Sequence, residues 1–370
     1  MDRDDKVHRW SWPTLREERY EPNIKGYLRT LGGLAVILMI ILALLWLIRL
    51  GYSLTWTGFG GYTTADGGYQ PAKTLWDWMA LLIIPAVLAV GGILFNRAER
   101  RAERRTASER TQDISLQSYF DVMTELIIDK SLGKSEENAE VRDIARARTL
   151  TVLRGLNGER KGMLLQFLYE ANLISGEPIV VLGGADLKNI DLCGANLANI
   201  DLSRTDLEGA RLDKTNLRNA NFSEAILDKA NLMLADISHA NLSGAHITDA
   251  KLQGTNLEHS DLSQAWLWGS HTYDANMNMT NLHKAILNQA RMLNTHLKKA
   301  DLREAKLKET ELYKADLREA NLNGADLSKA SLREVDLCGA NLQNAKVTDE
   351  QLAKAKTLEG TTLPDGTQHE

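Results

Sequence analysis

The sequence predicts a protein of mixed class, with an N-terminal transmembrane helical hairpin, a helical linker and a C-terminal solenoid. Three observations support this prediction. Leucine or a close substitute recurs every five residues from Leu187 to Val347, over about 33 consecutive units. Two long, predominantly apolar stretches lie at about 31–49 and 77–95. Between them and the repeats, apolar residues recur at the spacing of amphipathic helices. A rod of repeats has a regular surface, so this half of the chain is not expected to be an enzyme.

Composition and charge exclude few functions. The chain is 44% hydrophobic and 25% charged, and its formal net charge is -5 over 370 residues. This charge predicts neither a strong nucleic-acid binder nor a strongly acidic mimic. Cys193 and Cys338 stand about seven solenoid turns apart, which at roughly 4.8 Å per turn exceeds the reach of a disulfide. Free thiols fit a reducing cytoplasm.

The two apolar stretches are each close to the minimum length for crossing a bilayer. Lysine and arginine are frequent in 1–30 and again in 97–105, whereas the loop between the stretches carries few. The positive-inside rule therefore predicts that residues 31–96 form the transmembrane hairpin and that both chain ends are cytoplasmic, 1–30 being a cytoplasmic segment. In the loop, 57–60 weakly resembles a potassium-channel filter, but too few residues precede it for a re-entrant helix, so a glycine-rich turn is preferred.

The linker, 97–178, begins with a helix that is charged on all sides. Its arginines can contact anionic lipid headgroups, or they can form local ion pairs on a solvated helix. The candidate headgroup contacts are Arg97, Arg100, Arg101, Arg104 and Arg105.

Further along the linker, Leu116, Tyr119, Met123 and Leu126 have the 3-4-3 spacing of an amphipathic helix. Two more helices are predicted over 141–156 and 159–174. Because the last one directly precedes the repeats, where an apolar core would otherwise be open, we expect it to cap the solenoid.

The repeat region, 179–347, has a small residue, usually alanine, two positions before each central leucine. We expect both side chains to point inward. Thr348 and Gln351 have the spacing of a capping box, which predicts that 348–370 contain a short helix that closes the C-terminal end.

Units such as 195–199 (Ala-Asn-Leu-Ala-Asn) and 325–329 (Ala-Asp-Leu-Ser-Lys) resemble those of the pentapeptide repeat proteins. The resemblance implies a right-handed quadrilateral β-helix with four units per turn. The N-terminal half is similar to a module that precedes such repeats in membrane-anchored bacterial members, through 56–60, 73–78, 97–100 and 147–154. This implies a multi-pass protein of the bacterial inner membrane.

With four units per turn, residues 20 apart form columns. The column from Asp201 to Asn341 is uniformly Asp or Asn, whereas another becomes apolar over four turns. Large exposed apolar patches mark interaction sites, so we expect this strip to bind a protein or a second copy of the chain. The alternative is chance variation at outward positions. The candidate strip comprises Ile226, His246, Trp266, Trp268, Ile286, Met233, Tyr273, Leu293 and Tyr313.

The repeat is irregular near the strip. Thr272 stands where leucine is expected, which predicts a bulge or local opening. His239 and His259 share a column and could hold a metal ion, although a solvated pair is preferred. No Walker loop, dinucleotide fingerprint or zinc spacing is present, so no catalytic, cofactor or metal site is expected.

Three functions remain open from the sequence. A membrane-anchored, non-enzymatic scaffold, with the bilayer, a cytoplasmic protein and its own copies as partners, is preferred. A two-span oligomeric channel or permeabilising effector is the alternative, although the spans contain almost no polar residue. A DNA mimic, as in the quinolone-resistance members of the family, is less favoured because about 24 acidic and 19 basic residues are mixed along the repeats. No nucleic acid is expected as a partner.

Overall fold

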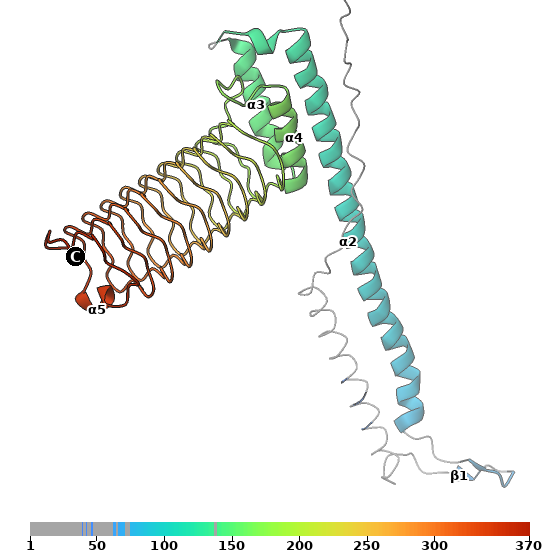
Figure 1. The fold of residues 1–370 in the computed structure, drawn as a ribbon. Coiled ribbons are helices and arrows are strands. Elements are labelled where there is room, and N and C mark those ends of the chain that lie inside the picture. The colour runs from blue at the N-terminus through green and yellow to red at the C-terminus, as the bar shows by residue number, and fades with distance from the viewer. Residues whose placement is uncertain are drawn as a thin grey trace, which may run out of the picture. The chain divides into compact units, whose positions relative to one another are not determined.

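The computed structural model describes residues 62–63, 66–70, 75–136 and 139–370, together with Met39, Leu42 and Trp46. The chain forms two compact units, Met1–Glu103 and Arg104–Glu370. Figure 1 shows the elements along the chain, which are β1 (Tyr62–Thr63), β2 (Tyr69–Gln70), α2 (Leu75–Ile128), the 3-10 helix η1 (Leu132–Lys134), α3 (Glu140–Gly155), α4 (Gly158–Glu170) and α5 (Asp349–Leu352).

In the first unit, β1 and β2 pair as a small antiparallel hairpin, and α2 begins five residues after β2. Apart from Met39, Leu42 and Trp46, the predicted span 31–49 lies outside the described residues, as does the loop segment 57–60. The predicted span 77–95 falls within α2. In the described part of the chain, no helix combines the length and the apolar character needed to cross a bilayer.

In the second unit, α2 from Arg104 onward packs with α3 and α4. The predicted amphipathic face is confirmed, because Leu116, Tyr119, Met123 and Leu126 are all buried. The Tyr119 hydroxyl lies 2.7 Å from Thr149 Oγ1 within this core. Burial raises the pKa of Tyr119, and the hydrogen bond with Thr149 opposes that rise only in part. The tyrosine is therefore a neutral structural group.

Helix α4 caps the coil at its N-terminal end, as the sequence predicted. Asn157 provides the helix N-cap, its side chain accepting a hydrogen bond from Arg160 N at 3.0 Å. Asp191 N of the first coil donates to Gly158 O at 3.0 Å. Because Gly158 and Gly162 have no Cβ, the helix backbone approaches the carbonyls of Asn189 and Asp191 directly. Its buried leucines, which close the apolar core, are Leu164, Leu165 and Leu168.

A buried lysine attaches α4 to the first coil. Lys161 is only 4% exposed, and its Nζ donates to Asp186 Oδ1 at 3.0 Å and to Lys188 O at 3.2 Å. Burial raises the pKa of the Asp186 carboxyl, but the hydrogen bonds from Lys161 and from the Lys188 N–H outweigh it and hold that pKa below its usual value. The ion pair therefore favours docking of the cap.

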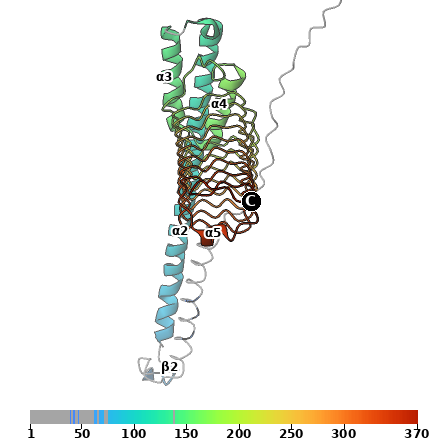
Figure 2. The same cartoon turned by 60° about the vertical axis from the view of Figure 1, so that its left-hand side comes forward.

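The repeats form a parallel β-helix whose stacked coils are seen from two directions in Figures 1 and 2. Bridges join residues 20 apart, as in Asp186 with Asp206 and Asp206 with Ile226, which gives four five-residue units per coil. Leu207 N donates to Ile226 O at 2.7 Å, and Asp206 N donates to Ala185 O at 3.0 Å. The central leucines and the alanines two positions earlier are buried as predicted, apart from Ala195 and the last central residue, Val347, which are partly buried.

Each unit turns through a residue with positive φ two positions after its centre. Glycine stands there in some units, such as Gly209 with φ of 68°, but most carry other residues, such as Lys229 with φ of 59° and Glu319 with φ of 59°. The turn is closed by a hydrogen bond such as Ile190 N to Leu187 O at 3.1 Å. This is the geometry of a type II turn. The ladder holds side chains in a conformation that is unfavourable for them in isolation.

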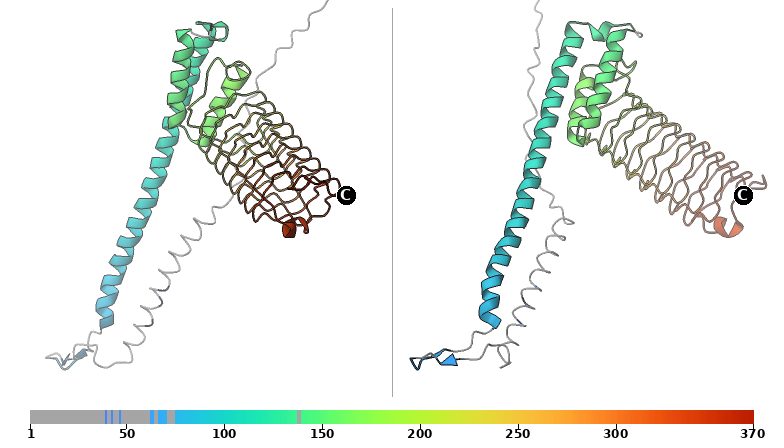
Figure 3. Two further views of the ribbon diagram at one scale, coloured as in Figure 1. Left: turned by 90° about the vertical axis from the view of Figure 1, so that its left-hand side faces the viewer. Right: turned by 180° about the vertical axis from the view of Figure 1, so that it is seen from behind.

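The coil extends beyond the predicted boundary at residue 347. After α5, Asp336 pairs with Thr357 and Asn341 pairs with Thr362, so the register lengthens from 20 to 21 residues. The inserted turn is α5, whose capping box between Thr348 and Gln351 is present as predicted. Figure 3 shows α5 at the end of the coil opposite α4. The cap therefore interrupts the last coil rather than following it.

The bulge expected at Thr272 is absent, and that prediction was wrong. Thr272 is fully buried, and its N–H donates to Arg291 O at 2.9 Å in the regular ladder. Its hydroxyl lies 3.0 Å from Thr295 Oγ1, which itself donates to the Thr272 carbonyl at 2.7 Å. Because a neighbouring coil supplies this partner, the interior accepts a hydroxyl in place of leucine. Both cysteines of the coil are free thiols.

Candidate interaction surface

The structure places the central column of the candidate strip on consecutive coils. Ile226 pairs with His246, His246 with Trp266, and Trp266 with Ile286, each through a parallel bridge. The rings of His246 and Trp266 stack at 5.0 Å between centroids with an interplanar angle of 4°. The ladder therefore fixes the backbone under each side chain, and the apolar atoms form one continuous line along the coil.

The other strip residues lie in two neighbouring columns. Trp268 follows Trp266 on the same face, and a further column on the adjacent face holds Met233, Tyr273, Leu293 and Tyr313. The most exposed members are Trp266 at 49%, Trp268 at 47%, Ile226 at 38% and Met233 at 37%, and the rest are partly buried. We call these nine predicted residues the Trp266 patch.

A column of basic residues runs inside the patch, which the sequence reasoning missed. Lys251 pairs with His271, and His271 pairs with Arg291. This column lies on the same face as Tyr273, on the side nearer to the tryptophans. The His271 and Tyr273 rings stack at 5.7 Å with an interplanar angle of 12°. Sorting the position before each central residue on this second face would have found the column, because the three residues are spaced 20 apart.

The face that lies opposite the basic column, next to the face of Trp266, is polar and internally bonded. Asn221 Nδ2 donates to Asp201 Oδ1 at 3.2 Å, and Asn281 Nδ2 donates to Asp261 Oδ1 at 2.9 Å. The same carboxylates also accept from backbone N–H groups two residues later, as Asp201 does from Ser203 N at 2.9 Å. The contact with the N–H two residues later recurs at each Asp or Asn of this column, from Asp201 to Asn341, so these side chains are held against their own backbone.

The two histidines singled out from the sequence do stack. The rings of His239 and His259 lie 5.0 Å apart with an interplanar angle of 9°. Within the described residues, no group of three or more His, Cys, Asp or Glu side chains is arranged to hold a metal ion. The pair thus stands as an isolated stack on one corner of the coil.

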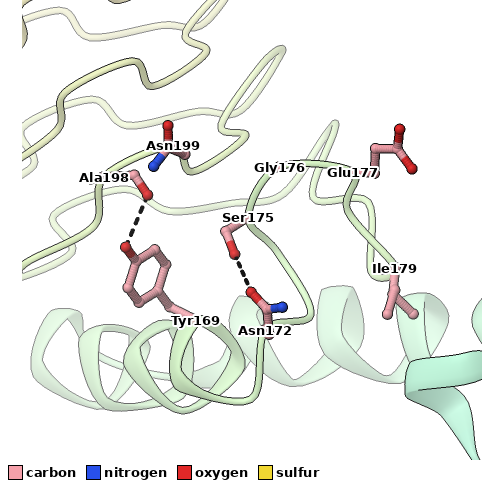
Figure 4. A pocket seen from close by; sticks show the side chains of 8 residues that line it. All are labelled: Tyr169, Asn172, Ser175, Gly176, Glu177, Ile179, Ala198 and Asn199. Carbon is pink, nitrogen blue, oxygen red and sulfur yellow. Dashed lines mark hydrogen bonds between the residues drawn. The ribbon is translucent and has the colours of Figure 1, made fainter.

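A shallow groove of about 620 Å³ lies where α4 meets the first coils (Figure 4). Tyr169 Oη donates to Ala198 O at 2.9 Å, and Ser175 Oγ donates to Asn172 Oδ1 at 2.9 Å. The first bond joins α4 to the coil, and the second holds the turn that follows α4. They fit a structural junction better than a ligand site.

The candidate headgroup contacts all lie on α2. Arg97, Arg100 and Arg101 are exposed, and Arg100 Nε donates to Asn96 Oδ1 at 2.8 Å, while Arg104 and Arg105 continue the same helix. In the same helix, residues of the predicted second span are exposed apolar side chains, including Val87, Leu88 and Phe95.

Four units per coil, inward leucine and alanine, and outward Asp and Asn ladders define a solenoid of five-residue repeats. A family model described as pentapeptide repeats matches with eight copies, over 200–238, 215–254, 235–264, 275–312 and 315–349. The chain belongs to the pentapeptide repeat family. No curated protein matches it.

Solved structures of similar chains include HetL, a pentapeptide repeat protein involved in heterocyst differentiation regulation from the cyanobacterium Nostoc sp. Strain PCC 7120. It is 30% identical, with 56% of this chain and 98% of that chain covered and a TM-score of 0.36. Full-length QnrB1, a plasmid-mediated fluoroquinolone resistance protein, is 20% identical, with coverage of 47% and 86% and a TM-score of 0.24. Rfr23 from the cyanobacterium Cyanothece 51142 is 26% identical, with coverage of 30% and 85% and a TM-score of 0.18.

Proposed function

We propose that the protein is a non-enzymatic scaffold whose coil binds a protein partner through the Trp266 patch. The observation that carries the proposal is the exposure of Trp266 and Trp268 beside Ile226 and Met233 on one side of the coil. Tryptophan contributes more binding energy than most residues when a partner covers it. On the face opposite the basic column, by contrast, Asp201 and Asp261 accept hydrogen bonds from asparagines of the next coil.

The packing of the coil supports a role that depends on its surface. Leucine and alanine side chains fill the interior, as the buried Leu227, Ala245 and Leu267 illustrate, so binding is left to the outward positions. The bridges beneath the patch hold its backbone before a partner arrives, as in the pairing of His246 with Trp266. A rigid surface of this kind loses little conformational entropy on binding.

We further propose that the scaffold is held at a bacterial inner membrane by 31–49 and 77–95, with both ends of the chain cytoplasmic. The support is the apolar sequence of these stretches and the exposure of Val87, Leu88 and Phe95. The arginines from Arg97 to Arg105 would then lie near the headgroups. Extraction of cell membranes at alkaline pH tests this proposal, and release of the full chain with peripheral proteins would contradict it.

The binding proposal is tested by the double variant Trp266→Ser and Ile226→Ser in the full chain. The matched control is Ser243→Ala with Ser263→Ala on the polar face opposite the basic column. We expect both variants to keep the far-ultraviolet circular dichroism of the parent, and only the first to lose its complexes in native membranes after chemical crosslinking. The same crosslinked bands in parent and patch variant would refute the proposal.

A further inference from the structure

The basic residues of the Trp266 patch differ from those elsewhere on the coil. Most coil lysines and arginines pair with a carboxylate on a neighbouring coil, as Lys284 does with Glu304 at 3.6 Å and Lys329 with Glu309 at 3.5 Å. Among the described coil residues, those that form no ion pair are Lys214, Lys251, Arg291, Lys306 and Lys308.

All but Lys214 lie either in the columns of the Trp266 patch or in the basic column between them. Lys251 and Arg291 flank His271 in the basic column, and Lys306 follows Ile286 in the column of Trp266. Lys308 follows Trp268 by two coils on the same face. Each of these four cations is exposed. Unpaired positive charge on the coil is therefore concentrated where the large apolar side chains are exposed.

In the described coil, no carboxylate lies within ion-pair distance of these four cations. Asp228 lies on the patch face, but its Oδ1 accepts from Thr248 N at 2.8 Å. Glu311 follows Arg291 in the basic column, yet the described residues contain no ion pair between them. Lys251 and Arg291 thus remain available to a charge from outside the chain.

From this arrangement we infer that the partner of the Trp266 patch is an acidic protein segment with apolar side chains between its carboxylates. The inference rests on the proposed function and names the partner's chemistry. Charge complementarity of this kind sets the choice of partner and the rate of association. The flanking tryptophans and Tyr273 would cover the apolar side chains of the segment, and the basic column would pair with its carboxylates.

The dimensions suit a short segment. From the coil of Ile226 to that of Lys306 there are four intervals of about 4.8 Å, or roughly 20 Å. An extended segment of about six residues covers that length at about 3.3 Å per residue. A second copy of the chain fits less well, because two identical basic columns would face each other across a symmetric interface.

A nucleic acid or an anionic lipid surface also carries negative charge. However, phosphate groups themselves make no apolar contact with Ile226, Met233 and Leu293, whereas an acidic segment with leucine or phenylalanine presents carboxylates and apolar side chains within one short strand. We therefore commit to a protein partner, and the other two classes become outcomes of the test.

The test uses the full chain as bait for a displayed library of random twelve-residue peptides. We expect enrichment of peptides in which Asp or Glu alternates with Leu, Phe or Trp. For the best peptide, the variant Lys251→Gln with Arg291→Gln should bind at least about tenfold more weakly. The control Ser243→Glu with Ser263→Glu makes the same change in net charge on the opposite face and should bind the peptide like the parent chain.

The other possible outcomes distinguish the acidic partner inferred here from the scaffold function proposed above. Apolar peptides that carry no acidic residues and that bind the double glutamine variant normally, but not Trp266→Ser, would overturn the acidic partner and keep the scaffold. A lack of any enrichment that depends on Trp266 would overturn both. Stronger binding of a single-stranded oligonucleotide or of phosphatidylglycerol vesicles than of any peptide, lost with Lys251→Gln and Arg291→Gln, would overturn the protein partner.

Discussion

Replacing Gly162 with alanine should loosen the cap that α4 forms on the coil. A Cβ at this position would press against Asp191 O, lie 3.3 Å from the Asp191 carbonyl carbon and lie 3.8 Å from Leu192 Cδ2. The first two atoms belong to backbone that is held in the coil, because Asp191 N donates to Gly158 O and Leu192 N donates to Arg211 O. Neither atom can move aside as a flexible side chain would.

The size of the effect follows from two opposing contributions. Forcing an extra carbon into a packed contact costs about 1–3 kcal/mol, whereas alanine favours a helix interior over glycine by about 1 kcal/mol. Complete detachment of α4 would expose Leu164, Leu165 and Leu168, at about 1.5–3 kcal/mol each. The helix should therefore shift rather than detach, with a net loss of up to about 2 kcal/mol.

A matched substitution gives the opposite expectation. Gly155, at the end of α3, has nothing within 4 Å of an added Cβ, so Gly155→Ala should leave the free energy of unfolding unchanged or raise it by up to about 1 kcal/mol. Urea titration and amide hydrogen exchange in α4 measure both variants. If Gly162→Ala is as stable as Gly155→Ala and its α4 amides exchange no faster than in the parent, α4 does not approach the coil as closely as described.

Three further predictions follow from the fold and the patch. Asp186 has a lowered pKa in the folded chain, so its pair with Lys161 should stabilise the cap at neutral pH and lose that contribution as the pH falls below about 4. In Asp186→Asn, the protection of the α4 amides from hydrogen exchange should therefore depend less on pH in this range. An unchanged pH profile would contradict the role of the pair. Gln264 has φ of 58°, a conformation that asparagine accepts more readily than a β-branched residue. Gln264→Val should therefore lower the free energy of unfolding by about 1–2 kcal/mol, while Gln264→Asn stays within about 0.5 kcal/mol of the parent. Equal melting temperatures for the two variants would refute the backbone argument. Trp266→Ser should leave the melting temperature within a few degrees of the parent, because about half of the tryptophan is already exposed. A large loss of stability would show that Trp266 stabilises the coil rather than serving to bind a partner.

The five-residue period made the interior of the coil predictable, because it directly assigns inward positions such as Leu187 and Ala210. It also located the cap, since a core that opens at Leu187 needs α4 to cover it. The period led to the prediction of a bulge at Thr272 because it compares each unit with the repeat pattern and ignores the neighbouring coils. The hydroxyl of Thr295, one coil away, makes threonine acceptable there, and such a contact is visible only once the coils are stacked.

Other features were hidden for physical reasons. Residues such as Lys229 and Glu319 adopt positive φ because the ladder imposes it, not because of their own preference, so no local signal marks them. The extension of the coil to Thr362 depends on α5 adding one residue to the register, which breaks the strict period. The basic column could be read from the spacing of Lys251, His271 and Arg291. The lack of ion pairs on Lys251 and Arg291 within the described residues depends on how the coils stack, which the spacing does not give.

The central claim is that the Trp266 side of the coil meets a protein in the cell. A photo-crosslinking amino acid placed at Ile286, a partly buried member of the patch, tests it most directly, with the same group at Ser243, on the polar face opposite the basic column, as the reference. We expect a discrete crosslinked product in intact cells from position 286 that is absent at 243 and is lost when Lys251→Gln and Arg291→Gln are added. Equal crosslinking from both positions, or none from 286, would contradict the claim.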